Sequence, residues 1–134
     1  QTVLHTIPAG QTNRHVFRFV FLDGCSTAKG DLPESFGILH KANVPRIYYY
    51  YASMRPSVFC GWSADKFVGN NFGNNINYDH VSFIQHIQEY MFLYSGTIGD
   101  AVPYAASQPD VVNLFTSEFK VFGCPDVTFG SDNN

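Results

Sequence analysis

The stretch HVFRFVFLDGCSTAKGDLPESFGI, residues 15–38, joins the most strongly apolar segment of the chain to a thiol. Residues 15–22 contain Val and Phe with one charged side chain, which is typical of a strand buried on both faces, as in a parallel sheet. Asp23 and Gly24 end this segment, so Cys25 is expected at the carboxyl end of the strand. A lone thiol there is either an inert buried cysteine or a nucleophile, because reactive groups of open α/β sheets collect at such ends.

The length and composition predict a single folded domain. The chain has 134 residues, 45% of them hydrophobic and 14% charged, so it can bury enough apolar surface to form a core. We expect residues 1–14 to form an arm or connecting loop and residues 15–134 to form one domain. Charged residues usually make up about a quarter of a soluble domain, so part of this surface is expected to be covered by another chain or segment.

Charge and hydropathy argue against two classes of protein. The formal net charge is −3 and no Lys/Arg cluster is present, which does not suit binding to the phosphates of nucleic acids. No apolar run approaches the ~18 residues that a membrane span requires. The first residues lack the basic start and apolar stretch of a signal peptide, so we expect a mature product or a fragment of a longer chain. The compartment is left open, with an extracellular location favoured.

Three cysteines, Cys25, Cys60 and Cys124, are an odd number and too few for a disulfide framework. If the protein is exported, Cys60 and Cys124 could pair and leave Cys25 free, although sequence does not supply their distance. No C-x-x-C pair is present, and His80 and His86 fall on different faces of a predicted helix, so no metal site is expected. No glycine-rich phosphate loop occurs either, and we expect no cofactor.

A helix is predicted to follow the cysteine loop. Asp31 can serve as its N-cap, Pro33 suits its first turn, and Glu34 occupies the capping-box position. The helix should extend over residues 32–42, although Gly37 weakens it.

Further elements are predicted along the rest of the chain. They are strands over residues 47–52 and 57–61, a surface loop over 64–79, helices over 80–94 and 97–106, and a strand, a Gly-Cys-Pro turn and a short strand over 119–129. Asn77 or Asp79 should cap the first of these helices, and Thr97 the second. On a strand, Tyr48–Tyr51 would alternate between a packed face and a solvent-exposed face. Alternatively, they would form a platform that binds a ligand.

The order of the expected elements predicts an α/β layer structure with a mostly parallel sheet. Three or four strands are few for such a sheet and leave it with an exposed edge. We therefore expect that the sheet is incomplete in this chain, and that a partner segment or a homo-oligomer completes it.

Four segments resemble the caspase–gingipain–separase class of cysteine peptidases. FVFLDGCSTAKG (residues 19–30) resembles the strand and catalytic-cysteine segment of that class, and PSVFCGW (56–62) is similar to its next core strand. FIQHIQEYMFLYSGTIGDAVPYA (83–105) is similar to the long helix, the glycine and the second helix of gingipain-like and related bacterial members. FKVFGCPDVTF (119–129) is similar to their terminal Gly-Asp-Pro strand, with Cys124 in place of the acid. The resemblance covers nearly all of the expected domain.

The resemblance implies a three-layer caspase-like α/β fold, of which this chain is the carboxyl-terminal part. It implies a peptide or protein substrate and makes Cys25 the nucleophile that attacks a peptide carbonyl. Backbone amides near Gly24 and Cys25 would stabilise the oxyanion. Asp23 would orient the substrate or cap the loop, and Trp62 would contact the substrate or pack in the core.

The chain departs from that class in its histidines. The class uses a His-Gly pair at the end of the strand before the cysteine strand, and no His-Gly pair occurs here. His15 should lie at the opposite end of the sheet from Cys25, so His5 is the local candidate for the base. The base could instead belong to an upstream part of the molecule or to a separate chain. Two other functions stay open: an inactive caspase-like scaffold used for assembly or recognition, and an unrelated α/β binding module.

Overall fold

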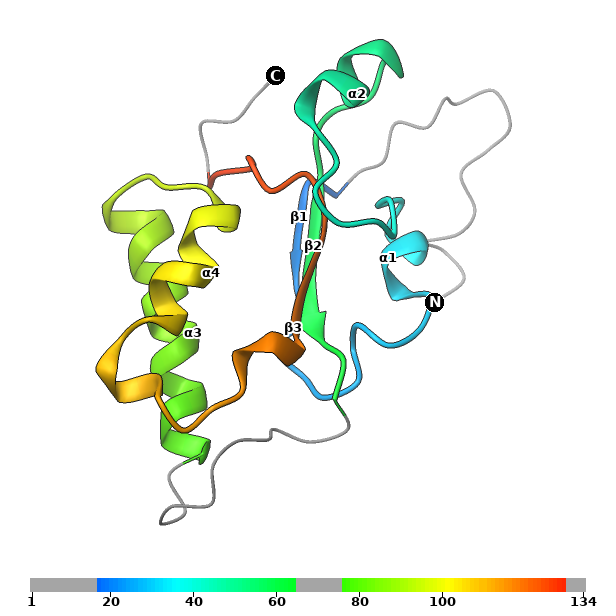
Figure 1. The fold of residues 1–134 in the computed structure, drawn as a ribbon. Helices are drawn as coiled ribbons and strands as arrows, with labels where there is room; N and C mark the ends of the chain where they lie inside the picture. Colours follow the sequence, from blue (N-terminus) through cyan, green and yellow to red (C-terminus); the bar gives the residue numbers. More distant parts are fainter. Residues whose placement is uncertain (1–16, 65–75, 130–134) are drawn as a thin grey trace.

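The computed structural model describes residues 17–64 and 76–129, which form an α/β domain. Its strands are β1 (Phe19–Phe21), β2 (Val58–Trp62) and β3 (Phe119–Gly123), and its helices are α1 (Leu32–Ser35), α2 (Arg46–Tyr51), α3 (Ile76–Leu93) and α4 (Ile98–Ala106). Two short 3-10 helices, η2 (Pro109–Val111) and η3 (Thr116–Glu118), connect α4 to β3. In Figure 1, α3 and α4 lie on one side of the sheet, α1 lies on the other, and α2 lies beyond one end.

The sheet is mixed rather than mostly parallel. Its central strand, β2, pairs in parallel with β1 and antiparallel with β3, so that Phe59 lies between Val20 and Phe122. The 3-10 helices explain the antiparallel pairing, because they return the chain from α4 to the carboxyl end of β2. There the Ser63 N–H donates to the Glu118 carbonyl at 2.8 Å, and β3 can only run back along β2.

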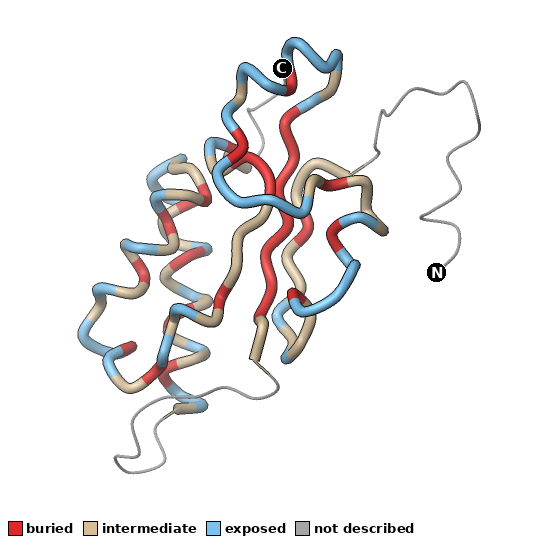
Figure 2. Tube along the Cα trace, turned by 45° about the vertical axis from the view of Figure 1, so that its right-hand side comes forward, coloured by how far each residue is buried: buried red, intermediate tan, exposed pale blue. Residues whose placement is uncertain are grey.

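β2 joins the two parts of the core, because all five of its residues are buried (Figure 2). Val58, Cys60 and Trp62 belong to the larger cluster under α3 and α4, whereas Phe59 packs with Val20 on the other face. The strand that is buried on both faces is therefore β2, and not the strand predicted over residues 15–22. β1 buries only Val20, because it lies at the edge of the described sheet; the first two residues of the predicted strand lie outside the described residues.

The helix predicted over residues 32–42 is much shorter in the structure, because α1 ends after one turn. Gly37 has a φ of +76°, a left-handed conformation that commonly ends helices. The Ile38 N–H donates back to the Pro33 carbonyl at 2.9 Å. Asp31 precedes the helix but makes no side-chain capping bond. Gly37, the residue that weakens the prediction, therefore turns the chain away from a helix just after α1 ends.

The strand predicted over residues 47–52 is wrong, since this segment forms the helix α2. Pro45 precedes the first turn, which its fixed φ suits. Tyr49 is fully buried, and its hydroxyl lies 3.4 Å from the Ser57 carbonyl oxygen, whereas Tyr50 and Tyr51 are 74% and 77% exposed. The burial of one tyrosine in the main cluster outweighs the weak preference of this residue type for strands.

α3 and α4 lie where the sequence predicts the two long helices. α3 begins at Ile76, so Asn77 and Asp79 lie in its first turn and neither caps it; the Asp79 carboxylate instead accepts a backbone N–H from beyond η2. The Thr97 hydroxyl accepts the N–H of Asp100 at 3.2 Å, as the capping pattern predicts. Within the described ranges, no helix is long and apolar enough to cross a membrane.

Gly123 ends β3 in a conformation that suits glycine alone. Its φ is +101°, and a Cβ at this position would collide with the Ser57 carbonyl oxygen. Its N–H donates to the Lys41 carbonyl at 2.7 Å, and its carbonyl accepts the Val44 N–H at 2.9 Å. The chain then turns, and over residues 124–129 the predicted second strand does not form.

We expect Gly123→Ala to lower the free energy of unfolding by about 2–3 kcal/mol, because alanine adds both backbone strain and a collision at β2. Gly30→Ala is the matched control, since a Cβ at Gly30 would meet nothing within 4 Å. That variant should stay within about 0.5 kcal/mol of the unaltered protein. Urea titrations followed by circular dichroism measure both, and equal stabilities would contradict the constraint assigned to Gly123.

His86 on α3 contacts two carboxylates, that of Glu89 on the same helix and that of Asp110 on η2. Its Nδ1 lies 3.1 Å from Glu89 Oε1, and its Nε2 lies 2.9 Å from Asp110 Oδ1. Partial burial alone would lower the pKa of His86, but the hydrogen bonds and charges of Glu89 and Asp110 outweigh it and raise that pKa. Burial likewise opposes the shift of Asp110, whose pKa is lowered by the bond and charge of His86.

The stabilisation from this contact should depend on pH. It is fully present below the unfolded histidine pKa of about 6.5 and is lost as the pH rises through the higher folded value. At the acid end it is lost as the pH falls through the lowered pKa of Asp110. We expect His86→Gln to cost about 0.5–1 kcal/mol at pH 5.5 and less at pH 9, a small effect because Asp110 is largely exposed. Urea titrations at both pH values test this, and equal losses would contradict it.

Candidate functional site

The loop of residues 23–30 follows β1 and lies against the carboxyl end of β2. Thr27 fixes it there: its hydroxyl oxygen lies 2.8 Å from the Gly24 carbonyl oxygen and accepts the Trp62 N–H at 3.0 Å. The Ala28 N–H donates to the Trp62 carbonyl at 2.9 Å. These bonds attach the loop to itself at Gly24 and to the end of β2 at Trp62. The residues between β1 and Thr27 therefore have a defined position at this edge.

Asp23 joins three elements at the same edge. Its Oδ1 accepts the Nε1–H of Trp62 at 2.9 Å and lies 2.8 Å from Nε2 of His80. Trp62 ends β2 and His80 lies on α3, and their rings meet edge to face with centroids 5.7 Å apart. The side chains of His80 and Asp23 are 14% and 34% exposed, so solvent shields their contact only partly. One carboxylate oxygen therefore fixes an imidazole beside the loop that bears Cys25.

Trp62 itself packs in the core. It is 1% exposed, and its ring lies against Phe83 and Phe119, with centroid distances of 5.7 and 5.0 Å. Of the two roles considered for it, this geometry is that of a packing residue whose Nε1–H also positions Asp23. Little of the indole is left for contact with a substrate.

The three cysteines differ in access to solvent. Cys25 is exposed, Cys60 and Cys124 are fully buried, and none of the three is in a disulfide, so the bond considered for Cys60 and Cys124 is not formed. Burial raises the pKa of Cys60 well above its ordinary value, which keeps that thiol protonated and unreactive. Cys25 is thus the thiol that a reagent or a substrate can reach.

Native protein should react with one equivalent of iodoacetamide, at Cys25. The reaction should be absent in Cys25→Ser and unchanged in Cys124→Ser, because only the first substitution removes an accessible thiol. Peptide mapping by mass spectrometry identifies the labelled residue. Equal labelling of all three cysteines, and only after denaturation, would contradict the exposed position of Cys25.

Among the described residues, one histidine contacts this loop. His5, the predicted base, lies outside the described residues. Of the histidines that the structure describes, His40 and His86 contact carboxylates on α1 and η2, whereas His80 contacts Asp23. No local sequence motif points to His80, which is considered only as a metal ligand together with His86 and rejected in that role. Its contact with Asp23 depends on how α3 packs against the sheet. Over residues 17–64 and 76–129, no group of three or more metal-ligating side chains is gathered.

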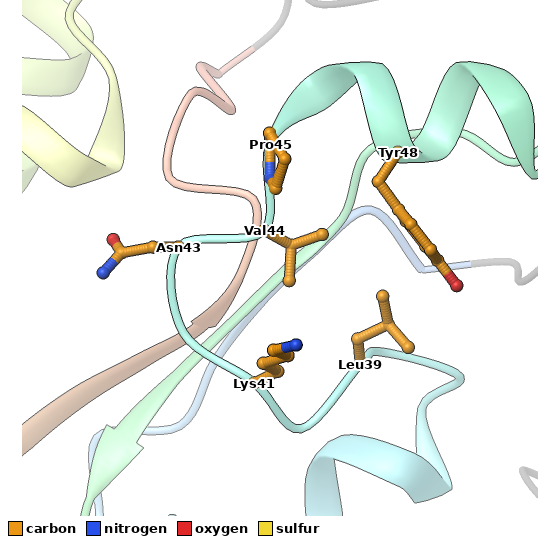
Figure 3. A pocket seen from close by; sticks show the side chains of 6 residues that line it. All are labelled: Leu39, Lys41, Asn43, Val44, Pro45 and Tyr48. Carbon is orange, nitrogen blue, oxygen red and sulfur yellow. The ribbon is translucent and has the colours of Figure 1, made fainter.

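A pocket of about 470 Å³ lies at the other end of the sheet (Figure 3). Its lining consists of Leu39, Lys41, Asn43, Val44, Pro45 and Tyr48. Figure 3 shows Leu39, Val44 and Tyr48 pointing toward one another, with Asn43 directed away from them. Because the Val44 N–H binds Gly123, opposite the first residue of β2, this pocket is separated from the Cys25 loop by the length of the strand.

Comparisons with protein families, with curated proteins and with solved structures found no match to this chain. The fold and the edge described above together define an α/β domain with an exposed thiol on a fixed loop, next to a carboxylate–imidazole pair.

Proposed function

We propose that this chain is a cysteine-peptidase-like domain in which Cys25 is the nucleophile for peptide-bond hydrolysis. One observation carries the proposal: the exposed thiol lies on a fixed loop, two residues after an aspartate that binds an imidazole. A purely structural cysteine would instead be buried, as Cys60 and Cys124 are. The resemblance of residues 19–30 to the catalytic-cysteine segment of the caspase–gingipain–separase class supports the same reaction.

In the proposed reaction, the Cys25 thiolate attacks the carbonyl carbon of a peptide bond and forms a tetrahedral intermediate. The C–N bond then breaks, the amine leaves with a proton from the imidazolium, and the acyl group stays on sulfur as a thioester. Water, deprotonated by the same imidazole, attacks the thioester and releases the acid and the thiol. The cycle requires one base and hydrogen-bond donors for the oxyanion.

We assign the base to His80, because it is the imidazole that contacts this loop among the described histidines. An Nε2–H donated to Asp23 makes Nδ1 the basic nitrogen. Asp23 thus acts as a positioning residue that holds the ring in one tautomer and orientation. His5, or a histidine from another part of the molecule, is the alternative base.

The oxyanion donors in this proposal are backbone amides. The Ser26 N–H donates to the Ala64 carbonyl at 2.8 Å, so it is already engaged. The N–H groups of Gly24 and Cys25 are the donors that we assign, since they belong to the cysteine that bears the sulfur and to the residue just before it. The substrate is a peptide or protein whose scissile carbonyl can approach this edge of the sheet.

An inactive scaffold on the same fold, used for assembly or recognition, is the second candidate. α2 presents Ile47, Tyr50 and Tyr51 to solvent, each more than half exposed. Aromatic residues of this kind are enriched at protein interfaces, because their rings bury a large area and their hydroxyls still find partners. In this function a partner segment or a second copy covers the surface, and Cys25 has no catalytic role.

The peptidase proposal is tested by cleavage of a mixed peptide library, with products identified by mass spectrometry. Cys25→Ala should abolish cleavage while the circular dichroism spectrum stays unchanged. His80→Gln should lower kcat/KM about 100-fold or more, because it removes the general base. His40→Gln is the matched control, since that imidazole contacts Glu34 on α1, and should retain full activity.

The possible results separate the alternatives. Cleavage that survives Cys25→Ala would exclude Cys25 as the nucleophile. Cleavage that is lost in Cys25→Ala but retained in His80→Gln would assign the base to His5 or to an upstream histidine. Absence of cleavage by every form, together with oligomers in size-exclusion chromatography, would favour the scaffold.

A further inference from the structure

β3 has an outer edge with open backbone groups. In this strand, Lys120 and Phe122 direct their N–H and C=O groups toward β2, so Phe119, Val121 and Gly123 direct theirs outward. The outward groups of Gly123 are bonded to the preceding loop, and the Phe119 N–H donates within η3. In the described part of the chain, the open groups of this edge are therefore the N–H and C=O of Val121 and the C=O of Phe119.

A hollow of about 300 Å³ lies along these groups. β3 forms one wall, and Gly99, Val102 and Pro103 of α4 form another. The segment of residues 41–44, which is bonded to Gly123, closes one end. The hollow thus combines an apolar wall with backbone donors and acceptors, which a purely apolar groove lacks.

We propose that this edge binds an extended peptide by strand addition, with Val121 as the central docking residue. The peptide residue opposite Val121 donates its N–H to the Val121 carbonyl and accepts the Val121 N–H, and the next residue but one reaches the Phe119 carbonyl. The directional bonds select a peptide backbone over a small apolar molecule. This binding site goes beyond the peptidase proposal and does not require Cys25 to react.

The side chains around the hollow define which peptide fits. Val121 and Val102 both pack against the larger core cluster, so the peptide residue opposite Val121 points to the α4 face and should be apolar. Its two neighbours point to the opposite face. The one after it lies opposite Lys120, where an acidic side chain is favoured, and the one before it lies opposite Phe122, where an apolar side chain is favoured. The expected ligand is therefore an extended peptide with the pattern apolar–apolar–acidic.

A second copy of β3 does not fit this edge. In a two-fold antiparallel pair centred on Val121, Phe119 of one copy would lie opposite Gly123 of the other. The segment of residues 41–44 already occupies that position, through its bonds to Gly123. A short peptide, or one that turns away after pairing with Val121, avoids this collision.

The test uses acetyl-Leu-Val-Glu-Thr-amide, which has no residue opposite Gly123, and 15N-labelled Cys25→Ala protein, so that cleavage cannot consume the probe. Saturating peptide should shift the amide resonances of β3 and α4 and slow hydrogen exchange of the Val121 amide about tenfold or more. N-methylation of the peptide valine, whose N–H pairs with Val121, should weaken binding about tenfold or more. N-methylation of the peptide leucine, whose N–H points away, should leave binding nearly unchanged.

Variants of the protein locate the site independently. Val102→Lys fills the hollow and should weaken binding about tenfold, whereas Val112→Lys, at a residue 62% exposed after η2, should bind the peptide as before. Lys120→Glu should weaken binding of the glutamate peptide and strengthen binding of acetyl-Leu-Val-Lys-Thr-amide.

Equal binding of the two N-methylated peptides would overturn strand addition, and so would shifts confined to other surfaces. A dimer that protects the Val121 amide without peptide would assign the edge to a second copy instead. If Val102→Lys fails to fold, the pair of N-methylated peptides still decides the question. Because the probe is measured on Cys25→Ala protein, this proposal and the peptidase proposal fail separately.

Discussion

The Thr27 hydroxyl is the contact on which the rest of the functional edge depends. It lies between the loop after β1 and the last residue of β2, where it receives the Trp62 N–H and bonds to carbonyls at the start of the loop. This approach requires Gly61, because any side chain there would collide with the hydroxyl. The contact decides where the chain leaves the sheet. Together with the Ala28–Trp62 and Ser26–Ala64 backbone bonds, it fixes the loop that bears Asp23 and Cys25 relative to β2.

The Asp23 carboxylate extends this local order to the helical layer. It connects the end of β2 with α3, through Trp62 on one side and His80 on the other. The pair is partly shielded from water, so the attraction is stronger than in a fully solvated pair while the site stays accessible. Positioned groups beside an accessible nucleophile suit covalent catalysis. The same rigidity would also serve recognition, and for that reason the reactivity of Cys25 separates the two functions proposed.

Sequence patterns predicted those parts of the fold that follow local rules. The capping pattern at Thr97, the apolar spacing of α3 and the short apolar strand β2 are of this kind. Prediction failed where a distant contact decides: burial of Tyr49 turns a tyrosine-rich strand into a helix, and the path through η2 and η3 sets the direction of β3. The site divides in the same way. Asp23 and Cys25 follow from the end of a strand, whereas His80 arrives through helix packing that no local pattern encodes.

The antiparallel pairing of β2 with β3 has a consequence for how the chain is made. The edge of β2 that pairs with β3 stays unpaired until Phe119–Gly123 has been synthesised, although Val58–Trp62 is complete much earlier. At ~5–20 residues per second, a nascent chain spends several seconds with this apolar strand uncovered on the ribosome. Newly made, unfinished chains are therefore the form most prone to aggregate, and chaperones that bind nascent chains should act on them most strongly.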